Sequence, residues 1–194
     1  FSLVCLRMME DKQHKAGFVS IIGKPNVGKS TLMNQLVGEK VSIITSKAQT
    51  TRHRILGIVN GDDFQVVFSD TPGILNPQYE LHKSMMGYVS SALEDADLIL
   101  YVTDIYEKYE EDRILEKLKN TETPIYLLLN KTDLAKQHQA GDKLKYWESV
   151  IPSKRSFLIS ALLGTGVPEL FSAVIESLPV HPAYYPKDAL SDRP

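Results

Sequence analysis

The sequence predicts an α/β protein in which a mostly parallel sheet of six strands, one of them antiparallel, carries helices on both faces. Three observations support this prediction. Short apolar runs alternate along the chain with segments of helical periodicity, the order expected of strand-helix-strand units. Most of the runs are uninterrupted, as in strands that are buried on both faces. Two other runs are joined by a short turn, which predicts a hairpin inside the parallel sheet.

The predicted strands follow from these apolar runs. Four runs are expected to be central strands, and they cover residues 18–22, 98–102, 125–129 and 157–159. The predicted hairpin comprises residues 54–60 and 64–69, joined by Asn60, Gly61, Asp62 and Asp63. These are residue types that favour turns because they hydrogen-bond locally or tolerate a positive φ.

The helical segments between the runs are recognised by apolar residues three and four positions apart. The clearest pattern consists of Val167, Leu170, Phe171, Val174, Ile175 and Leu178. A less regular pattern runs through residues 81–93, with Gly87 in its middle. Residues 107–116, EKYEEDRILE, form a charged run that is expected to be the solvated face and first turn of a helix.

Composition limits the choice of function class. The 194 residues carry a formal net charge of -2 and 43% hydrophobic side chains, which is typical of an ordinary globular chain. This charge gives no general attraction to nucleic acid or to a membrane surface. Cys5 is the only cysteine and the chain has no long apolar run, so neither an internal disulfide nor a transmembrane segment is expected. These features favour a location in the cytoplasm.

The first motif is GKPNVGKS at residues 23–30, which follows a predicted strand and precedes a predicted helix. Its spacing GxxxxGK[ST] is typical of a phosphate-binding loop. Glycines allow successive backbone N–H groups to face a phosphate, Lys29 adds a positive charge, and the Ser30 hydroxyl is a ligand suited to Mg²⁺. The motif predicts a nucleoside triphosphate site and leaves the base undetermined.

The second motif is NKTD, where Asn130, Lys131 and Asp133 follow the apolar run IYLLL. Ligands of open α/β sheets bind at the carboxyl ends of the strands, which is where this motif is expected to lie. The Asp133 carboxylate can accept hydrogen bonds from the guanine ring N1–H and exocyclic amine, whereas adenine presents an acceptor there. The motif therefore predicts GTP rather than ATP, and it disfavours a metabolic kinase that contains a phosphate loop.

Three further segments are predicted to complete the site. Asp70 begins DTPG, in which the Asp70 carboxylate is expected near Mg²⁺ and the Gly73 amide near the γ-phosphate. The polar segment 41–54 offers Thr51, beside Thr50, as a second hydroxyl ligand of the metal. Residues 160–162, SAL, follow the last predicted strand and are expected beside the base.

Taken in this order, GKPNVGKS, KAQTTR, DTPG, NKTD and SAL resemble the five nucleotide motifs of translation-factor-type GTPases, and more closely those of the Era family of bacterial ribosome-assembly GTPases. The resemblance covers the chain from about Lys15 onward and includes KAQTTRHRILGI and the tail YYPKD. It implies a three-layer P-loop GTPase fold of the Ras-like kind. Its implied cofactors are GTP or GDP and Mg²⁺. The implied function is a GTP-hydrolysing switch in 16S rRNA processing and 30S small ribosomal subunit assembly.

The resemblance also implies a domain organisation. Residues 1–9 are expected to be cloning-derived or disordered, residues 10–180 to form the GTPase domain, and residues 181–194 to be a proline-containing linker. In the Era family this linker leads to an RNA-binding KH domain, which is not expected within this chain. Contacts with 16S rRNA and the 30S subunit are expected mainly through that domain. A location in the cytoplasm, or peripheral on the inner face of the cell membrane, is implied.

The predicted site residues fall into three groups. Those expected to bind the nucleotide are Asn26, Val27, Gly28, Lys29, Ser30, Thr31, Asp70, Gly73, Asn130, Lys131, Asp133, Ser160, Ala161 and Leu162. Those expected to hold the metal are Ser30, Thr51 and Asp70, and those expected to act in catalysis are Lys29, Thr51, Gly73 and Asn26.

One departure from other GTPases affects the predicted mechanism. Many GTPases place a glutamine directly after the DTPG-type motif to orient the attacking water, but this chain has Ile74 there. Slow intrinsic turnover is expected, and a GTP-dependent binding scaffold with negligible hydrolysis stays open as an alternative. The family resemblance suggests that Asn26 holds a K⁺ ion beside the phosphates. A second interpretation, in which the Asn26 side chain only braces the loop, also stays open.

Overall fold

A computed structural model describes residues 13–38, 41–42, 54–70, 93, 95–110 and 113–187. Its sheet consists of β1 (Lys15–Ile22), β2 (Val41–Ser42), β3 (Arg54–Asn60), β4 (Phe64–Asp70), β5 (Leu98–Asp104), β6 (Ile125–Asn130) and β7 (Arg155–Leu158). The order across the sheet is β2-β3-β4-β1-β5-β6-β7. Six strands form the predicted sheet, in which β3 alone is antiparallel to the other five, and the two-residue β2 extends one edge. The predicted α/β fold class is confirmed, as is the β3–β4 hairpin.

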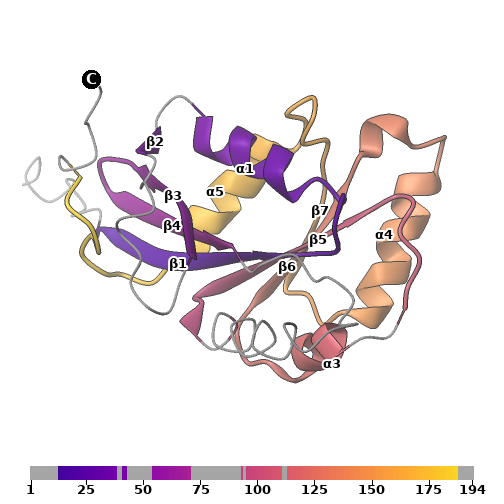
Figure 1. Ribbon diagram of the computed structural model, residues 1–194, viewed down its shortest axis with the longest axis horizontal. Coiled ribbons are helices and arrows are strands. Elements are labelled where there is room, and N and C mark those ends of the chain that lie inside the picture. The colour runs from indigo at the N-terminus through magenta and orange to yellow at the C-terminus, as the bar shows by residue number, and fades with distance from the viewer. Residues whose placement is uncertain are drawn as a thin grey trace, which may run out of the picture.

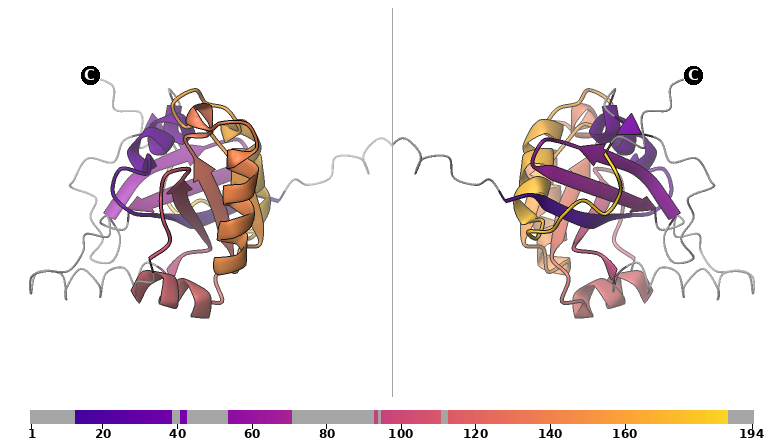
Figure 2. Two further views of the ribbon diagram at one scale, coloured as in Figure 1. Left: turned by 90° about the vertical axis from the view of Figure 1, so that its right-hand side faces the viewer. Right: turned by 90° about the vertical axis from the view of Figure 1, so that its left-hand side faces the viewer.

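Helices cover both faces of this sheet (Figures 1 and 2). The described helices are α1 (Lys29–Val37), α3 (Arg113–Asn120), α4 (Gln139–Val150), α5 (Val167–Ser177) and the short 3₁₀ helix η4 (Thr132–Leu134). The helical pattern predicted from Val167 onward is therefore confirmed as α5. Most of the helix predicted over residues 81–93 lies outside the described residues. Within the described part of the chain, no helix has both the length and the apolar character needed to cross a bilayer.

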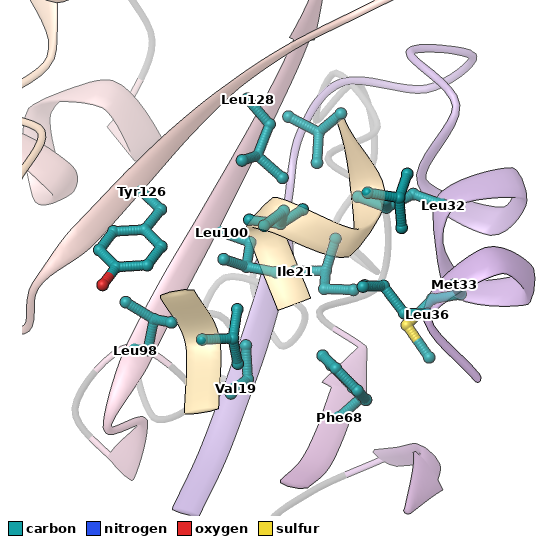
Figure 3. Close-up of a cluster of buried hydrophobic side chains, with 14 of the residues drawn as sticks. Val19, Ile21, Leu32, Met33, Leu36, Phe68, Leu98, Leu100, Tyr126 and Leu128 are labelled. Atoms are coloured by element: carbon teal, nitrogen blue, oxygen red, sulfur yellow. The ribbon is translucent and has the colours of Figure 1, made fainter. Parts of the chain in front are cut away.

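Alternate residues of the central strands supply two separate cores. On β5, Leu98, Leu100 and Val102 pack with α1 and α5, while Ile99 and Tyr101 pack with α3 and α4. Figure 3 shows the first core, where side chains from β1, β5 and β6 meet those of α1. Because both faces of β5 are buried, an uninterrupted apolar run is what this strand requires.

The parallel register brings the carboxyl ends of the strands that carry the motifs together at one end of the sheet. Ile21 of β1 pairs with Asp70 of β4, and Asp104 of β5 pairs with Asn130 of β6. The segments after β1, β4, β5 and β6 therefore start close to one another. This end of the sheet is the position expected for a ligand site in an open α/β fold.

Two expectations about individual segments were wrong. The run predicted over residues 157–159 is not a central strand, because β7 is the last strand of the sheet and pairs only with β6 among the described strands. Leu158 is accordingly 42% exposed. The charged run 107–116 is not uniformly solvated, since the Glu107 side chain is only 6% exposed and α3 begins at Arg113. Glu107 is buried because it has polar partners on β5 and in the phosphate loop, which are described with the site below.

Residues 179–187 pack against the opposite end of the sheet, where β1 begins. Val180 bridges to Lys15 at the start of β1, and the ring of Tyr184 lies 4.7 Å from that of Phe18 between centroids. The contact is organised by Gln65 of β4, which is fully buried. Its Oε1 accepts the backbone N–H groups of Tyr184 and Tyr185 at 2.8 and 3.0 Å, and its Nε2 donates to the Tyr185 carbonyl at 2.8 Å. Part of the predicted linker therefore packs on the domain, and Gln65 supplies three of the hydrogen bonds that hold it there.

We expect Gln65→Leu to lower the free energy of unfolding by about 2 kcal/mol, because it leaves the Tyr184 and Tyr185 backbone groups without their buried partner. Urea unfolding would measure the loss. Amide hydrogen exchange at Tyr184 and Tyr185 should accelerate in the same variant. Gln137→Leu, at an exposed position, is the control. A loss no larger than that of the control would contradict the role assigned to Gln65.

Candidate nucleotide-binding site

The loop of residues 23–30 connects β1 to α1, and its backbone can be formed only with glycine at two positions. Gly28 has φ +99°, and a Cβ atom there would lie 2.2 Å from Nδ2 of Asn130. A Cβ atom on Gly23 would lie 2.3 Å from the carbonyl oxygen of Val102 in β5. Asn26 also has a positive φ, 66°, which asparagine adopts more readily than most residues. The loop is therefore packed tightly against the neighbouring strands.

The side chain of Lys29, the first residue of α1, reaches back to the start of this loop. Its Nζ donates to the carbonyl oxygens of Gly23 and Lys24, at 2.8 and 2.7 Å. The N-terminal turn of α1 contributes backbone N–H groups and the positive end of the helix dipole, with the exposed side chains of Ser30 and Thr31 beside them. The ammonium group and the helix amides can donate to phosphate oxygens, and the hydroxyl oxygen of Ser30 is a ligand that suits Mg²⁺.

Asn130, at the end of β6, joins two of the predicted motifs. Its Nδ2 donates to the Val27 carbonyl oxygen at 2.8 Å, and its Oδ1 accepts the backbone N–H of Ala161 at 2.9 Å. The residue is only 2% exposed. These contacts make Asn130 a buried bridge between the phosphate loop and residues 160–162, a role that the tetrapeptide pattern alone does not reveal.

Lys131 makes a second connection from β6 to the phosphate loop. Its Nζ donates to the Asn26 carbonyl oxygen at 2.7 Å and to Oδ2 of Asp104 at 2.6 Å. Asp104 is buried at the end of β5, where its Oδ1 also accepts the backbone N–H groups of Tyr106 and Glu107. Sequence reasoning missed Asp104, although an acidic residue directly after a buried strand was a signal that could have identified it.

Asp133 of the fourth motif and Ser160 of the fifth are in direct contact. The Ser160 hydroxyl donates to Oδ1 of Asp133 at 2.7 Å, and it also accepts the backbone N–H of Leu163 at 3.2 Å. Asp133 is exposed, whereas Ser160 and Ala161 are buried. Leu162 is 71% exposed beside them. An acceptor-only carboxylate is therefore held at the surface above a buried hydroxyl.

Part of the predicted site cannot be placed. Thr51, Gly73 and Ile74 lie outside the described residues. The backbone of Asp70 ends β4 at the same end of the sheet, but its side chain also lies outside the described part. Of the three predicted metal ligands, only the Ser30 side chain is therefore located. No hydrogen bond joins the Asn26 side chain to the described residues, so the bracing interpretation has no supporting contact in this part of the chain.

Glu107 is a charged residue near the loop that sequence reasoning placed on a solvated surface. Its Oε2 accepts the Thr103 hydroxyl at 2.7 Å, and its Oε1 lies 3.5 Å from Nζ of Lys24 in the phosphate loop. Burial raises the pKa of the Glu107 carboxyl above its ordinary value, an effect opposed by the Thr103 hydrogen bond and the Lys24 charge. The repulsion from Asp104 adds a smaller increase to the same pKa.

Comparison with known proteins agrees with this geometry. A protein-family profile described as 50S ribosome-binding GTPase matches residues 18–131, more than half of the chain. Among curated proteins, a relative from Oryza sativa subsp. japonica described as "GTPase ERA-like, chloroplastic" is 45% identical over 186 residues. That match covers 93% of this chain and 44% of the rice protein, so the chain spans less than half the length of this relative.

Two solved structures of Era are also similar. A variant of Aquifex aeolicus Era bound to GDP.AlF4- matches with a TM-score of 0.73 and 38% identity, covering 93% of this chain and 62% of that one. Era in complex with MgGDPNP and nucleotides 1506-1542 of 16S ribosomal RNA matches with a TM-score of 0.75 and 37% identity, covering 93% and 63%. The chain therefore belongs to the family described as 50S ribosome-binding GTPase, and the resemblance to Era that its motifs predict is confirmed by these relatives.

Proposed function

We propose that this chain is the guanine-nucleotide-binding and GTP-hydrolysing domain of an Era-type molecular switch. The observation that carries the proposal is the position of Asp133. Asp133 follows β6, and its carboxylate accepts a hydrogen bond from Ser160, which follows β7. Asn130 and Lys131, at the end of β6, are hydrogen-bonded to the phosphate loop. The base-selecting group and the phosphate-binding loop are thus connected by direct contacts.

The phosphates of the nucleotide would be bound by the loop of residues 23–30. Gly28 and the first turn of α1 supply backbone N–H groups, Lys29 supplies a positive charge, and Asn26, Val27 and Thr31 flank the anion. Ser30, together with Thr51 and Asp70, would hold Mg²⁺, which neutralises charge on the β- and γ-phosphates when it is bound. The Gly73 amide would contact the γ-phosphate. Both nucleotides bound in the Era structures are guanine nucleotides, and one is described with magnesium, which supports this proposal.

Guanine would be selected by Asp133, with Lys131, Ala161 and Leu162 around the ring. The carboxylate accepts the ring N1–H and the exocyclic amine, while one oxygen also keeps its bond from Ser160. Adenine offers an acceptor at the ring nitrogen and has no amine at the second position. It would therefore leave the carboxylate without the two donors that guanine supplies.

Turnover of GTP would depend mainly on electrostatic stabilisation of the phosphoryl group. Lys29, Thr51, Gly73 and Asn26 are the proposed contributors, since the Ile74 side chain has no group that can orient a water molecule. Hydrolysis is favoured over a purely nucleotide-dependent scaffold because the Aquifex aeolicus relative is described with GDP.AlF4-. The scaffold remains the second candidate, supported by the isoleucine at position 74.

The biological role would be assembly of the small ribosomal subunit through 16S rRNA. The Era structure described with 16S ribosomal RNA supports this assignment. From the family resemblance, RNA contacts are assigned mainly to a KH domain that follows the GTPase domain in Era proteins, and this chain covers 63% of that Era chain.

Calorimetric titration with GDP, a non-hydrolysable GTP analogue and ADP tests the proposal directly. We expect the two guanine nucleotides to bind and ADP to bind at least about a thousandfold more weakly, because its base leaves the Asp133 carboxylate unsatisfied. Equal binding of adenine and guanine nucleotides, or binding of neither, would refute the proposed function.

Asp133→Asn is expected to shift preference from GDP toward xanthosine diphosphate, because the asparagine amide can donate to the additional carbonyl of xanthine. Competition between the two nucleotides for the variant would measure the shift. Asp142→Asn, at an exposed position at the start of α4, is a matched control that should keep the guanine preference. Unchanged guanine preference in Asp133→Asn would remove this residue from the base site.

Single-turnover GTP hydrolysis should be at least about tenfold faster in K⁺ than in Na⁺ if Asn26 holds a potassium ion against the phosphates. Asn26→Gly should abolish this difference. Glycine adopts the positive φ of position 26 without strain, so the variant removes the side-chain amide while keeping the loop conformation. Equal rates of the unmodified chain in the two salts would exclude Asn26 from catalysis.

A further inference from the structure

A turn outside the five nucleotide motifs makes contact with the phosphate loop. It follows β5 and consists of residues 104–107, whose backbone is fixed by Asp104: Oδ1 accepts the N–H groups of Tyr106 and Glu107 at 2.9 and 2.8 Å. Two carboxylates of this turn each face a lysine. Asp104 pairs with Lys131, and Glu107 pairs with Lys24. The Glu107 pair therefore connects this turn directly to the loop that we assign to the phosphates, whereas Asp104 reaches the loop through Lys131, which donates to the Asn26 carbonyl oxygen.

Among the residues that the structure describes, two acidic ones lie near Lys24, and their surroundings differ sharply. Glu107 Oε1 and Glu110 Oε2 are 3.5 and 3.6 Å from the Lys24 Nζ. The Glu110 side chain is 80% exposed, so water screens its pairing and little coupling is expected. The Glu107 side chain is 6% exposed and is held in place by the Thr103 hydroxyl. Only Glu107 is therefore a fixed, poorly solvated partner of the lysine.

The position of Lys24 matters because its backbone contacts the catalytic lysine of the proposed function. The Lys24 carbonyl oxygen accepts Nζ of Lys29 at 2.7 Å. A constraint on the Lys24 side chain thus limits the movement of a carbonyl that orients the Lys29 ammonium. The route runs from Thr103 through Glu107 and Lys24 to Lys29, and each step is a contact in the structure.

We infer that Glu107 is a positioning residue of the nucleotide site, whose buried carboxylate anchors Lys24 and thereby the phosphate loop around Lys29. This inference rests on the proposed function, because it concerns the affinity of the same loop for nucleotide. Glu107 itself touches neither phosphate nor metal in this account. Its removal should weaken nucleotide binding through the loop without changing the choice of base.

A pH dependence follows from the groups that face Glu107. Lys24 and the Thr103 hydroxyl favour its ionised form, whereas burial and the nearby Asp104 disfavour it, and the pKa is raised overall. The ionised form is the one that anchors Lys24. Acidification through the raised pKa therefore removes the anchor from the unmodified chain. A glutamine at position 107 has no such titration.

The test is the dissociation constant of GDP for the unmodified chain, Glu107→Gln and Glu110→Gln, measured by calorimetry at about pH 8 and at a series of lower pH values. At the higher pH we expect Glu107→Gln to bind GDP about tenfold more weakly, while Glu110→Gln stays within about twofold. As the pH falls, the ratio between the dissociation constants of Glu107→Gln and the unmodified chain should move toward one, because the raised pKa brings protonation of Glu107 to a higher pH than that of an ordinary glutamate. Titration of the GDP phosphates affects all three proteins equally and cancels in this ratio.

Lys24→Met examines the same ion pair from the other side. If the two residues act as a unit, Glu107→Gln should add little to the loss already caused by Lys24→Met. Thermal unfolding of each variant shows that it is folded, and the ADP-to-GDP affinity ratio should stay unchanged. The inference is overturned if folded Glu107→Gln binds GDP as tightly as the unmodified chain, or more tightly, at the higher pH. Failure of the unmodified chain to bind GDP would instead refute the proposed function.

Discussion

The structure depends on holding an irregular loop in one conformation at the end of a sheet. The phosphate loop contains two residues with positive φ, Asn26 and Gly28, and its carbonyl groups turn toward lysine side chains rather than into regular secondary structure. Such a backbone is costly unless its polar groups find fixed partners. Three side chains supply these partners. Asn130 and Lys131 donate to the Val27 and Asn26 carbonyl oxygens, and Lys29, within the loop itself, donates to two further carbonyl oxygens.

Those partners are available only because the strands are parallel and in one register. Asp104 pairs with Asn130 across β5 and β6, so the acidic turn after β5 and the NKTD segment after β6 leave the sheet side by side. A shift of one residue would exchange the two faces of a strand and turn its apolar side chains away from their core. The two buried cores therefore fix the register, and the register brings together the side chains that hold the loop.

The sequence was informative where a feature is encoded locally, and less so where it depends on tertiary contacts. The phosphate loop, the hairpin and α5 follow from glycine spacing, turn residues and helical periodicity, all read within a few residues. The edge position of β7 could not be read in this way, because an apolar run does not reveal whether a strand has one neighbour or two. Gln65 and Glu107 were missed for the same reason, because each has a partner that is remote in the sequence: Tyr185 is 120 positions from Gln65, and Lys24 is 83 positions from Glu107. A polar residue in a strand or a charged run is ordinarily exposed, and only the fold shows that these two are buried.

The contacts also explain how a site can be preformed yet still able to accept a ligand. The Ser160 hydroxyl donates to one oxygen of the Asp133 carboxylate. A carboxylate can accept about four hydrogen bonds, so two donors from a base can be added without breaking this one. Lys29 differs, because its ammonium already donates to two loop carbonyls. A phosphate oxygen would compete with these carbonyls for the ammonium donors of Lys29. Anchoring the Lys24 carbonyl from outside keeps that acceptor in place, so the ammonium stays directed into the loop while phosphate binds.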